Sequence, residues 1–260
     1  MFRLPTRVFA AMLALMLLLP SAFTPAAAQS TQKAPAGQSA FSEAQRKEIV
    51  EILRKALRTD PSILRDAVAA IKADAEREEA AATNSLIARN AEALTRTAAD
   101  PVGGNPNGDV TVVEFYDLTC PYCRRTLPVV AELLRTDPKV RIVYKDIPIL
   151  SAGSVVGARA VLAAQRQGGY LRLREALMTG PAAITQDVVK SAAERVGLDW
   201  ERLRQDMTDP AIQARLDANL KLASALQVQG TPAYVIGRQF HSGAMALDEM
   251  QDMVALARRR

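Results

Sequence analysis

Hydrophobic and polar residues recur with different spacings along the chain, and the change of spacing divides the sequence into two regions. From Ile49 to Leu57, apolar residues recur every three or four positions, which predicts an amphipathic helix that begins at Ser42. A second helix is predicted from Pro61 to about Thr97, because Asp60 is a good N-cap and proline is tolerated at the first helical position. Its apolar seam comprises Leu64, Val68, Ile71, Ala75, Ala82, Leu86 and Ala93.

This second helix has no apolar partner next to it in the sequence, so its seam needs to be buried against something else. Two alternatives stay open. The seam packs on the protein's own second region, or residues 41–97 form a coiled-coil-like stalk through which copies of the chain associate. We assign residues 41–99 to a helical stalk, although the pattern alone favours neither alternative.

Beyond the stalk, residues 100–108 are rich in Gly, Pro and Asn, which predicts a linker. The β-branched and aromatic residues of Val110–Tyr116 then predict a strand. Further strands are predicted at Val140–Lys145, Ala233–Ile236 and Gln239–Ser242, and helices at Pro121–Arg135, throughout 152–227 with caps at Thr185, Asp199 and Asp209, and at Leu247–Arg259. The order is βαβ, a helical block, then ββα, and it predicts a second domain over residues 109–260.

The first 28 residues have the three parts of a secretory signal peptide. Arg3 and Arg7 supply positive charge, residues 8–19 are an unbroken apolar run, and Ala26–Ala28 supply a small-residue cleavage site. The apolar run is too short to cross roughly 30 Å of hydrocarbon as a helix. We therefore expect an exported, periplasmic protein whose residues 29–40 form a polar, disordered tether.

Composition and charge exclude several classes of protein. The net charge is +5, but the leader arginines and the Arg258–Arg260 tail account for all of it, so no basic face for nucleic acid is expected. With two cysteines and one histidine, a zinc site of three or four Cys and His ligands is also not expected. The sequence suggests no resident metal or cofactor.

The two cysteines form the motif Cys120-Pro121-Tyr122-Cys123, where a strand is followed by a helix. Unpaired N–H groups and the dipole at a helix N-terminus favour a thiolate. Cys120 is therefore expected to be the exposed attacking sulfur, and Cys123, one turn further, the shielded resolving sulfur. Half a zinc site, a structural disulfide and a Cys120–His241 hydrolase pair are weaker alternatives, and His241 is expected to lie on the terminal hairpin.

The run from Val113 to Cys123 resembles the active-site strand and helix of the DsbA family of bacterial thiol–disulfide oxidoreductases. The run Gly230–Gly237 resembles the family's cis-proline loop. The resemblance implies an α/β thioredoxin fold with a helical domain inserted at about 152–227. It also implies a cis bond between Thr231 and Pro232, and a substrate-binding region formed by Thr231, Pro232, Pro121 and Tyr122.

Glu114 matches the family's buried acid, which exchanges a proton with the resolving cysteine. A strand glutamate that reaches solvent is the alternative. Lys145, at the end of the next predicted strand, is a candidate partner for Glu114 because the two strands are expected to be neighbours.

The N-terminal segment from Phe41 to Ile49, followed by the Ala-rich helix, resembles the ScsC-like branch of the family, whose members can oligomerise through such a stalk. Tyr122 adds no positive charge next to Cys123, so the resemblance implies a weaker oxidant than members with histidine there. Thr231 is the residue seen in isomerase-like members. A stalk that gathers several active sites would also favour isomerisation.

We therefore predict a disulfide isomerase or shuffling enzyme that acts on exported cysteine-containing proteins. A membrane redox partner of the DsbD type would keep it reduced. The alternatives are a monomeric dithiol oxidase, with a partner of the DsbB type, and a chaperone or copper(I)-handling protein, because thiolates are soft ligands.

Overall fold

The computed structural model describes residues 41–96 and 99–259, so the predicted signal peptide (1–28) and tether (29–40) lie outside the described residues. The chain divides into two compact units between Ile63 and Leu64. This division differs from the boundary expected at 100–108, because the end of the predicted stalk packs into the core of the larger unit, as described below.

Helix α1 (Glu43–Thr59) begins where the sequence predicts. The Ser42 hydroxyl accepts a hydrogen bond from the Gln45 backbone N–H at 3.3 Å, and the Gln45 side chain accepts one from the Ser42 N–H at 2.8 Å. This reciprocal capping box satisfies two N–H groups that the helix itself cannot pair. None of the residues of α1 is buried, so its apolar stripe is open to solvent within its own unit.

The second predicted helix is divided in two. Helix α2 (Ser62–Arg89) is followed by Asn90, whose side-chain amide donates to the Leu86 carbonyl at 2.8 Å, and then by α3 (Ala91–Thr95). The prediction of one helix to Thr97 is therefore wrong at its end. Ile87 and Leu94 are buried in a hydrophobic cluster with residues of the sheet, so this end of the segment is part of the larger unit.

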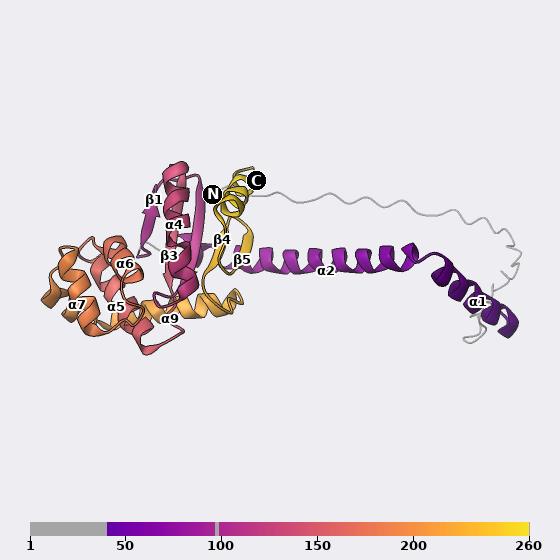
Figure 1. Ribbon diagram of the computed structural model, residues 1–260, viewed down its shortest axis with the longest axis horizontal. Coiled ribbons are helices and arrows are strands. Elements are labelled where there is room, and N and C mark those ends of the chain that lie inside the picture. Colours follow the sequence, from indigo (N-terminus) through magenta and orange to yellow (C-terminus); the bar gives the residue numbers. More distant parts are fainter. Residues whose placement is uncertain (1–40, 97–98, 260) are drawn as a thin grey trace, which may run out of the picture. The chain divides into compact units, whose positions relative to one another are not determined.

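Five strands form the central sheet in the order β1-β3-β2-β4-β5, and only β2 and β3 are parallel (Figure 1). The strands are β1 (Val102–Gly104), β2 (Val110–Tyr116), β3 (Val140–Asp146), β4 (Ala233–Ile236) and β5 (Gln239–Ser242). Part of the predicted linker is thus an edge strand. Gly103 permits this pairing, because a Cβ there would lie 2.9 Å from the Tyr144 hydroxyl.

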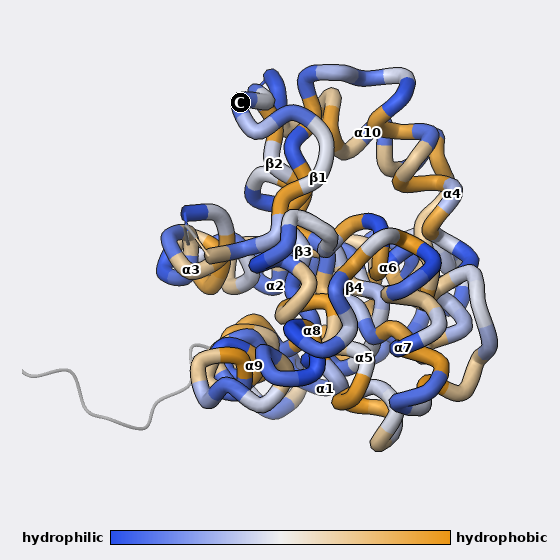
Figure 2. The backbone as a smooth tube through the Cα atoms, turned by 90° about the vertical axis from the view of Figure 1, so that its left-hand side faces the viewer, coloured by the Kyte–Doolittle hydropathy of each residue, from blue (hydrophilic) through white to orange (hydrophobic). Residues whose placement is uncertain are grey.

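The other helices of the described residues are α4 (Pro121–Thr136), α5 (Ala152–Gln165), α6 (Tyr170–Thr179), α7 (Gln186–Arg195), α8 (Trp200–Asp206), α9 (Pro210–Ala225) and α10 (Leu247–Arg258). Helices α5 to α9 are inserted between β3 and β4, and Thr185, Asp199 and Asp209 cap three of them as predicted. Figure 2 shows hydrophobic and hydrophilic stretches following one another along α4, α7 and α10, as expected of helices that bury one face.

Side chains alternate between the two faces of the sheet. One face, which includes Tyr116, Tyr144 and Tyr234, packs against α4, α10 and the inserted helices α5 to α8. The other face, which includes Phe115 and Val143, packs against α9, α3 and the end of α2. The architecture is a thioredoxin fold with a helical insertion, as predicted.

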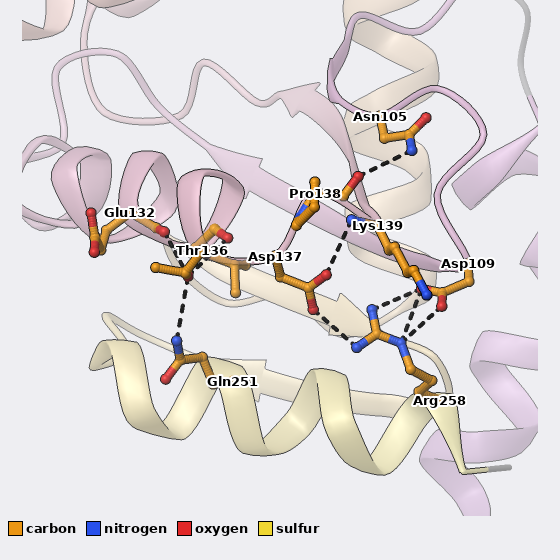
Figure 3. A network of polar contacts seen from close by, with 10 residues as sticks. Asn105, Asp109, Glu132, Thr136, Asp137, Pro138, Lys139, Gln251 and Arg258 are labelled. Atoms are coloured by element: carbon orange, nitrogen blue, oxygen red, sulfur yellow. Dashed lines mark hydrogen bonds and ion pairs between the residues drawn. The ribbon is translucent and has the colours of Figure 1, made fainter.

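A surface network joins the C-terminal helix to the rest of this fold (Figure 3). The Arg258 guanidinium donates to both carboxylate oxygens of Asp109 and to Asp137, at 2.8–3.0 Å. Asp109 directly precedes β2 and Asp137 follows α4, so one side chain of α10 ties together three elements. The Gln251 amide adds a longer contact to the Thr136 hydroxyl at 3.5 Å.

Candidate active site

The two cysteines lie at the start of α4 and belong to the hydrophobic cluster that the sheet shares with the inserted helices. Cys120 is the N-cap residue, with Pro121 in the first helical position, and Cys123 is in the first turn. Both are free thiols, and Cys123 has no exposed surface. The prediction that the Cys123 sulfur is shielded is confirmed.

Cys120 is buried as well, with 3% of its surface exposed, so the prediction of an exposed sulfur is wrong in this state. The reason is the loop before β4, where the bond between Thr231 and Pro232 is cis as predicted. The Cys120 thiol donates to the Thr231 carbonyl oxygen at 3.2 Å, so this loop lies directly against the sulfur. The structure therefore brings together the two motifs that the sequence separates by more than a hundred residues.

Asp117 supports the turn that precedes Cys120, and the sequence analysis missed it. Its side chain is buried and accepts hydrogen bonds from the Thr119 N–H at 2.8 Å and from the Ile149 and Leu150 N–H groups at 2.9 and 3.1 Å. The carboxylate thus connects the cysteine turn to the loop after β3. No signal in the sequence joins residues more than thirty positions apart in this way.

Apolar and aromatic side chains around this turn are exposed. Tyr122 is 53% exposed and stacks under the Arg125 guanidinium, which lies 4.5 Å from its ring centroid. Ile149 and Leu150, held by Asp117, are also exposed. Exposed apolar groups next to a reactive centre are typical of a surface that binds another molecule.

Glu114 lies in β2 with its side chain buried, as predicted. Its Oε2 accepts a hydrogen bond from Arg174 Nη2 in α6 at 2.9 Å. The Arg174 guanidinium is also within 4.3 and 4.4 Å of the ring centroids of Tyr116 and Tyr144. The sequence analysis did not find Arg174, because nothing distinguishes it from the other arginines of the insertion.

The predicted pairing of Lys145 with Glu114 is wrong. Glu114 is opposite Tyr144 in the β2–β3 register, and Lys145 is opposite Phe115, so the two side chains are on different faces of the sheet. Lys145 instead donates to Asp100 Oδ2 at 2.6 Å and to the Ala93 carbonyl at 2.7 Å. Arg215 Nη2 completes this buried cluster with a 2.5 Å hydrogen bond to Asp100 Oδ1.

Burial is the largest influence on the pKa values of Glu114 and Cys123. It raises the pKa of Glu114, and the charge of Arg174 counteracts only part of that rise. Burial also raises the pKa of the Cys123 thiol strongly, with a smaller contribution in the same direction from the Glu114 charge. Cys123 therefore needs a proton acceptor before it can attack as a thiolate.

His241 lies in β5, on the terminal hairpin as expected, where its Nδ1 is 3.3 Å from Glu249 Oε1. Because His241 contacts Glu249 and the Cys120 thiol contacts Thr231, the two do not form a Cys–His pair. Over residues 41–96 and 99–259, no three Cys, His, Asp or Glu side chains form a group that would hold a metal ion.

Comparison with known proteins agrees with this geometry. The model of a family described as a DSBA-like thioredoxin domain matches residues 111–255. A thioredoxin-like oxidoreductase from Silicibacter pomeroyi DSS-3 is 42% identical, with a TM-score of 0.64 over 65% of this chain and 98% of the other. The structure of Proteus mirabilis ScsC in a transitional conformation is 27% identical, with a TM-score of 0.62 over 85% of this chain and 98% of the other.

Among curated proteins, the Na⁺/H⁺ antiporter NhaA 1 of Salinispora arenicola (strain CNS-205) is 29% identical over 160 residues, which are 61% of this chain. The chain spans only about a quarter (24%) of that relative's length. No helix in the described part of the chain is both long and apolar enough to cross a membrane. Because the matching family model covers more than half of the chain, the protein belongs to the DSBA-like thioredoxin-domain family.

Proposed function

We propose that the protein is a periplasmic disulfide isomerase in which Cys120 attacks substrate disulfides and Cys123 resolves the product. The observation that carries this proposal is the Cys120 thiol at the N-cap of α4, hydrogen-bonded at 3.2 Å to the backbone beside Pro232. A sulfur at a helix N-terminus is stabilised as a thiolate, and the adjoining backbone offers polar groups to an extended substrate chain.

The exchange proceeds in two balanced steps. The Cys120 thiolate attacks one sulfur of a substrate disulfide, forming a mixed disulfide and releasing the second substrate sulfur as a thiolate. The complex is then resolved in one of two ways. In the first, the released thiolate attacks a different substrate disulfide, and the thiolate that this frees attacks the substrate sulfur of the mixed disulfide, which releases Cys120 as a thiolate and leaves the substrate isomerised. In the second, Cys123 loses its proton and attacks Cys120, which leaves the substrate reduced and the protein oxidised.

Glu114 is the proposed proton acceptor for Cys123. The Glu114 side chain is buried, and its negative charge raises the pKa of the Cys123 thiol. A buried carboxyl with a raised pKa accepts and returns a proton close to neutral pH more readily than an exposed one.

The direction of the exchange depends on how far the protein favours its reduced form. Tyr122 contributes no positive charge between the cysteines, which supports a modest oxidant rather than a strong one. Thr231, half-buried beside the Cys120 sulfur, is the residue that the family resemblance associates with isomerases.

The proposed substrates are exported proteins that contain cysteine, in partly folded states that expose apolar residues. Tyr122, Ile149 and Leu150 offer an exposed apolar surface for them. Pro121 precedes Tyr122 in the chain, and the Thr231–Pro232 loop contacts the Cys120 sulfur. A membrane reductase of the DsbD type would return Cys120 and Cys123 to the thiol state after net reduction of a substrate.

The export of the chain is proposed on the pattern of residues 1–28. The N-terminal helices support association of several copies. Ile52 and Leu53 in α1 and Leu64, Val68 and Ile71 in α2 are all between 56% and 69% exposed. A row of exposed apolar residues of this size, repeating at helical spacing, is typical of a helix that packs on a second copy.

The first test compares Cys120→Ala and Cys123→Ala with the unmodified protein in refolding of a scrambled-disulfide substrate. Cys120→Ala is expected to abolish refolding, and Cys123→Ala to accumulate a covalent complex on non-reducing gels. His241→Asn serves as a control and is expected to have no effect. If both cysteine variants refold the substrate normally, the enzyme proposal is wrong, and if they lose only copper(I) binding, the metal-handling alternative replaces it.

The same assay tests the stalk. Leu53→Glu with Ile71→Glu is expected to give a monomer by sedimentation that still reduces insulin but refolds the scrambled substrate poorly, since linked active sites raise the effective thiol concentration. Lys47→Glu, on the polar side of α1, is the matched control. A monomeric unmodified protein that only oxidises reduced substrates would favour the dithiol-oxidase alternative.

A further inference from the structure

Arg174 is an unusual residue for the interior of this domain. It lies in α6, in the inserted helices, and its guanidinium is buried between the rings of Tyr116 and Tyr144 while it donates to Glu114 at 2.9 Å. The side chains of Arg174 and Glu114 are only 4% and 1% exposed. The insertion thus supplies the positive charge for an acid that belongs to the thioredoxin sheet.

This ion pair is incompletely satisfied. Within the described part of the chain, Glu114 Oε1 and Arg174 Nε have no hydrogen-bond partner although both atoms are buried. Burying two charges costs free energy that a pair repays only when its remaining donors and acceptors are also used. Stability alone therefore does not account for an arginine and a glutamate at these positions.

A second arginine fixes the position of α6 relative to the cysteines. Arg124, next to Cys123 in α4, donates to the carbonyl oxygens of Leu177 at 3.0 Å, Gly180 at 2.8 Å and Pro181 at 2.9 Å. Its Nε also donates to the Leu118 carbonyl at 3.1 Å, in the turn before Cys120. The end of α6 is thus attached to the cysteine helix, and Arg174 is held in register with the active site.

We propose that Arg174 is a positioning residue for thiol–disulfide exchange: from the helical insertion it holds the Glu114 carboxylate charged and oriented, so that this carboxylate accepts the Cys123 proton. The proposal rests on the proposed role of Glu114 and extends it to the insertion. In the step concerned, the Cys123 S–H bond breaks and its proton passes to Glu114. The Cys123 sulfur then bonds to the Cys120 sulfur, and the substrate sulfur leaves as a thiolate.

The charges around Glu114 give the direction of the effect. Arg174 is the positive group that lowers the pKa of Glu114. Its loss leaves burial opposed only by the smaller effect of a hydrogen bond from Tyr234, so the carboxyl is protonated over a wider pH range. A protonated Glu114 no longer accepts a proton, while burial still keeps the pKa of Cys123 raised. The other titratable groups around this pair are Tyr116 in β2, Tyr144 and Asp146 in β3, Tyr170 in α6, Tyr234 in β4 and Cys120 at the start of α4.

A rapid-mixing experiment with dithiobis(nitrobenzoate) tests this. Cys120 attacks the reagent and releases one nitrobenzoate thiolate, and Cys123 then attacks the mixed disulfide and releases the second. For Arg174→Met we expect an unchanged first phase and a second phase at least about tenfold slower near neutral pH, with the midpoint of its pH profile moved to higher pH. Arg174→Lys is expected to restore most of the rate. Arg172→Met, on the exposed side of α6, is the matched control.

A double-mutant cycle separates positioning from a merely structural role. Glu114→Gln is expected to slow the second phase, and adding Arg174→Met to it should change neither the rate nor the pH profile further. An Arg174→Met profile that matches the unmodified protein, or an equal slowing in the Glu114→Gln background, would overturn the proposal. If Arg174→Met does not fold, Arg174→Lys and the double variant, which lacks both buried charges, still decide the question. Failure of the proposed function is distinguishable, because the second phase of the unmodified protein would then depend on reagent concentration, as expected if Cys123 reacts with the reagent rather than with the mixed disulfide at Cys120.

Discussion

Each face of the central sheet buries an ion pair, and the two pairs differ in how completely their polar atoms are used. On the face toward α9, Lys145 and Arg215 together occupy both oxygens of Asp100, at 2.6 and 2.5 Å. On the face toward α6, one oxygen of Glu114 and one nitrogen of Arg174 have no partner within the described residues. The first cluster lies away from the cysteines, and the second lies beneath them.

This difference indicates that the Asp100 cluster stabilises the fold, whereas the Glu114 cluster takes part in the chemistry. The Asp100 cluster attaches the segment after α2 to the sheet, with help from Arg141, which donates to the Thr95 carbonyl at 2.9 Å. Both oxygens of its single carboxylate accept a hydrogen bond from a cation. The Glu114 cluster keeps an acid whose pKa is raised, next to a thiol whose pKa is also raised. Incomplete pairing leaves that acid able to change its protonation state.

Breaking the satisfied cluster should produce the largest loss of stability. Lys145→Met leaves Asp100 buried with one of its two cationic partners, and removing one member of a buried ion pair typically costs about 3–5 kcal/mol. We expect a fall of that size in the free energy of unfolding, measured with denaturant, and no change in the thiol-exchange rate of the folded fraction.

Lys139→Met is the matched control, because Lys139 is exposed directly before β3 and should have little effect. A large change in exchange rate with Lys145→Met, measured where the variant is folded, would show that the cluster toward α9 also takes part in the chemistry. The contrast between the two faces would then be wrong.

The sequence predicts most of the sheet and the cysteine pair, because these depend on local patterns. The strand Val110–Tyr116 and the hairpin strands match the alternating or apolar runs that the sequence contains, and the helix caps are recognisable side chains. Strand β1 was missed because Gly103 and Gly104 are typical of a loop, and they pair only because the edge of β3 is available. Local pattern carries no information about that edge.

Partners across the fold were not predictable for the same reason. Arg172 and Arg174 are two positions apart in one helix, yet the first is exposed and the second is buried against Glu114. Only the packing of α6 on the sheet distinguishes them. The incorrect pairing of Lys145 has a simpler cause, since neighbouring strands were considered without the alternation of side chains between the two faces.

Asp146 provides a second test of the face that contains Glu114, because its contribution to stability should depend on pH. It lies on the same face as Glu114 and accepts hydrogen bonds from Tyr116 at 2.5 Å and Tyr170 at 2.9 Å. Burial, only partly opposed by these bonds, raises its pKa from 3.8 to about 6. The folded protein therefore binds this proton more tightly than the unfolded chain. The stability that Asp146 contributes is complete below pH 3.8 and is lost as the pH rises through about 6.

Asp146→Asn removes this titration, because an amide accepts from one tyrosine and donates to the other without ionising. The free energy of unfolding of the variant, relative to the unmodified protein, should therefore increase by an amount on the order of 3 kcal/mol as the pH rises across that range. Denaturant unfolding at a series of pH values measures it. A difference that stays constant with pH would show that Asp146 ionises as it does in water, and that this face does not shift its acids as proposed.

Arg258 also forms ion pairs with carboxylates, but at the surface of the protein. It therefore tests whether burial or the number of hydrogen bonds determines how much an ion pair contributes to stability. It forms four hydrogen bonds to Asp109 and Asp137, more than Lys145 forms to its partners, but its side chain is 35% exposed. Water and salt screen such pairs, so Arg258→Met should lower the free energy of unfolding by less than about 1 kcal/mol. This small loss should shrink further at high salt, whereas the loss from Lys145→Met should persist.

Arg259→Met, at the neighbouring exposed position, is the control. If Arg258→Met costs as much as Lys145→Met, the number of hydrogen bonds rather than burial sets the stability of these clusters.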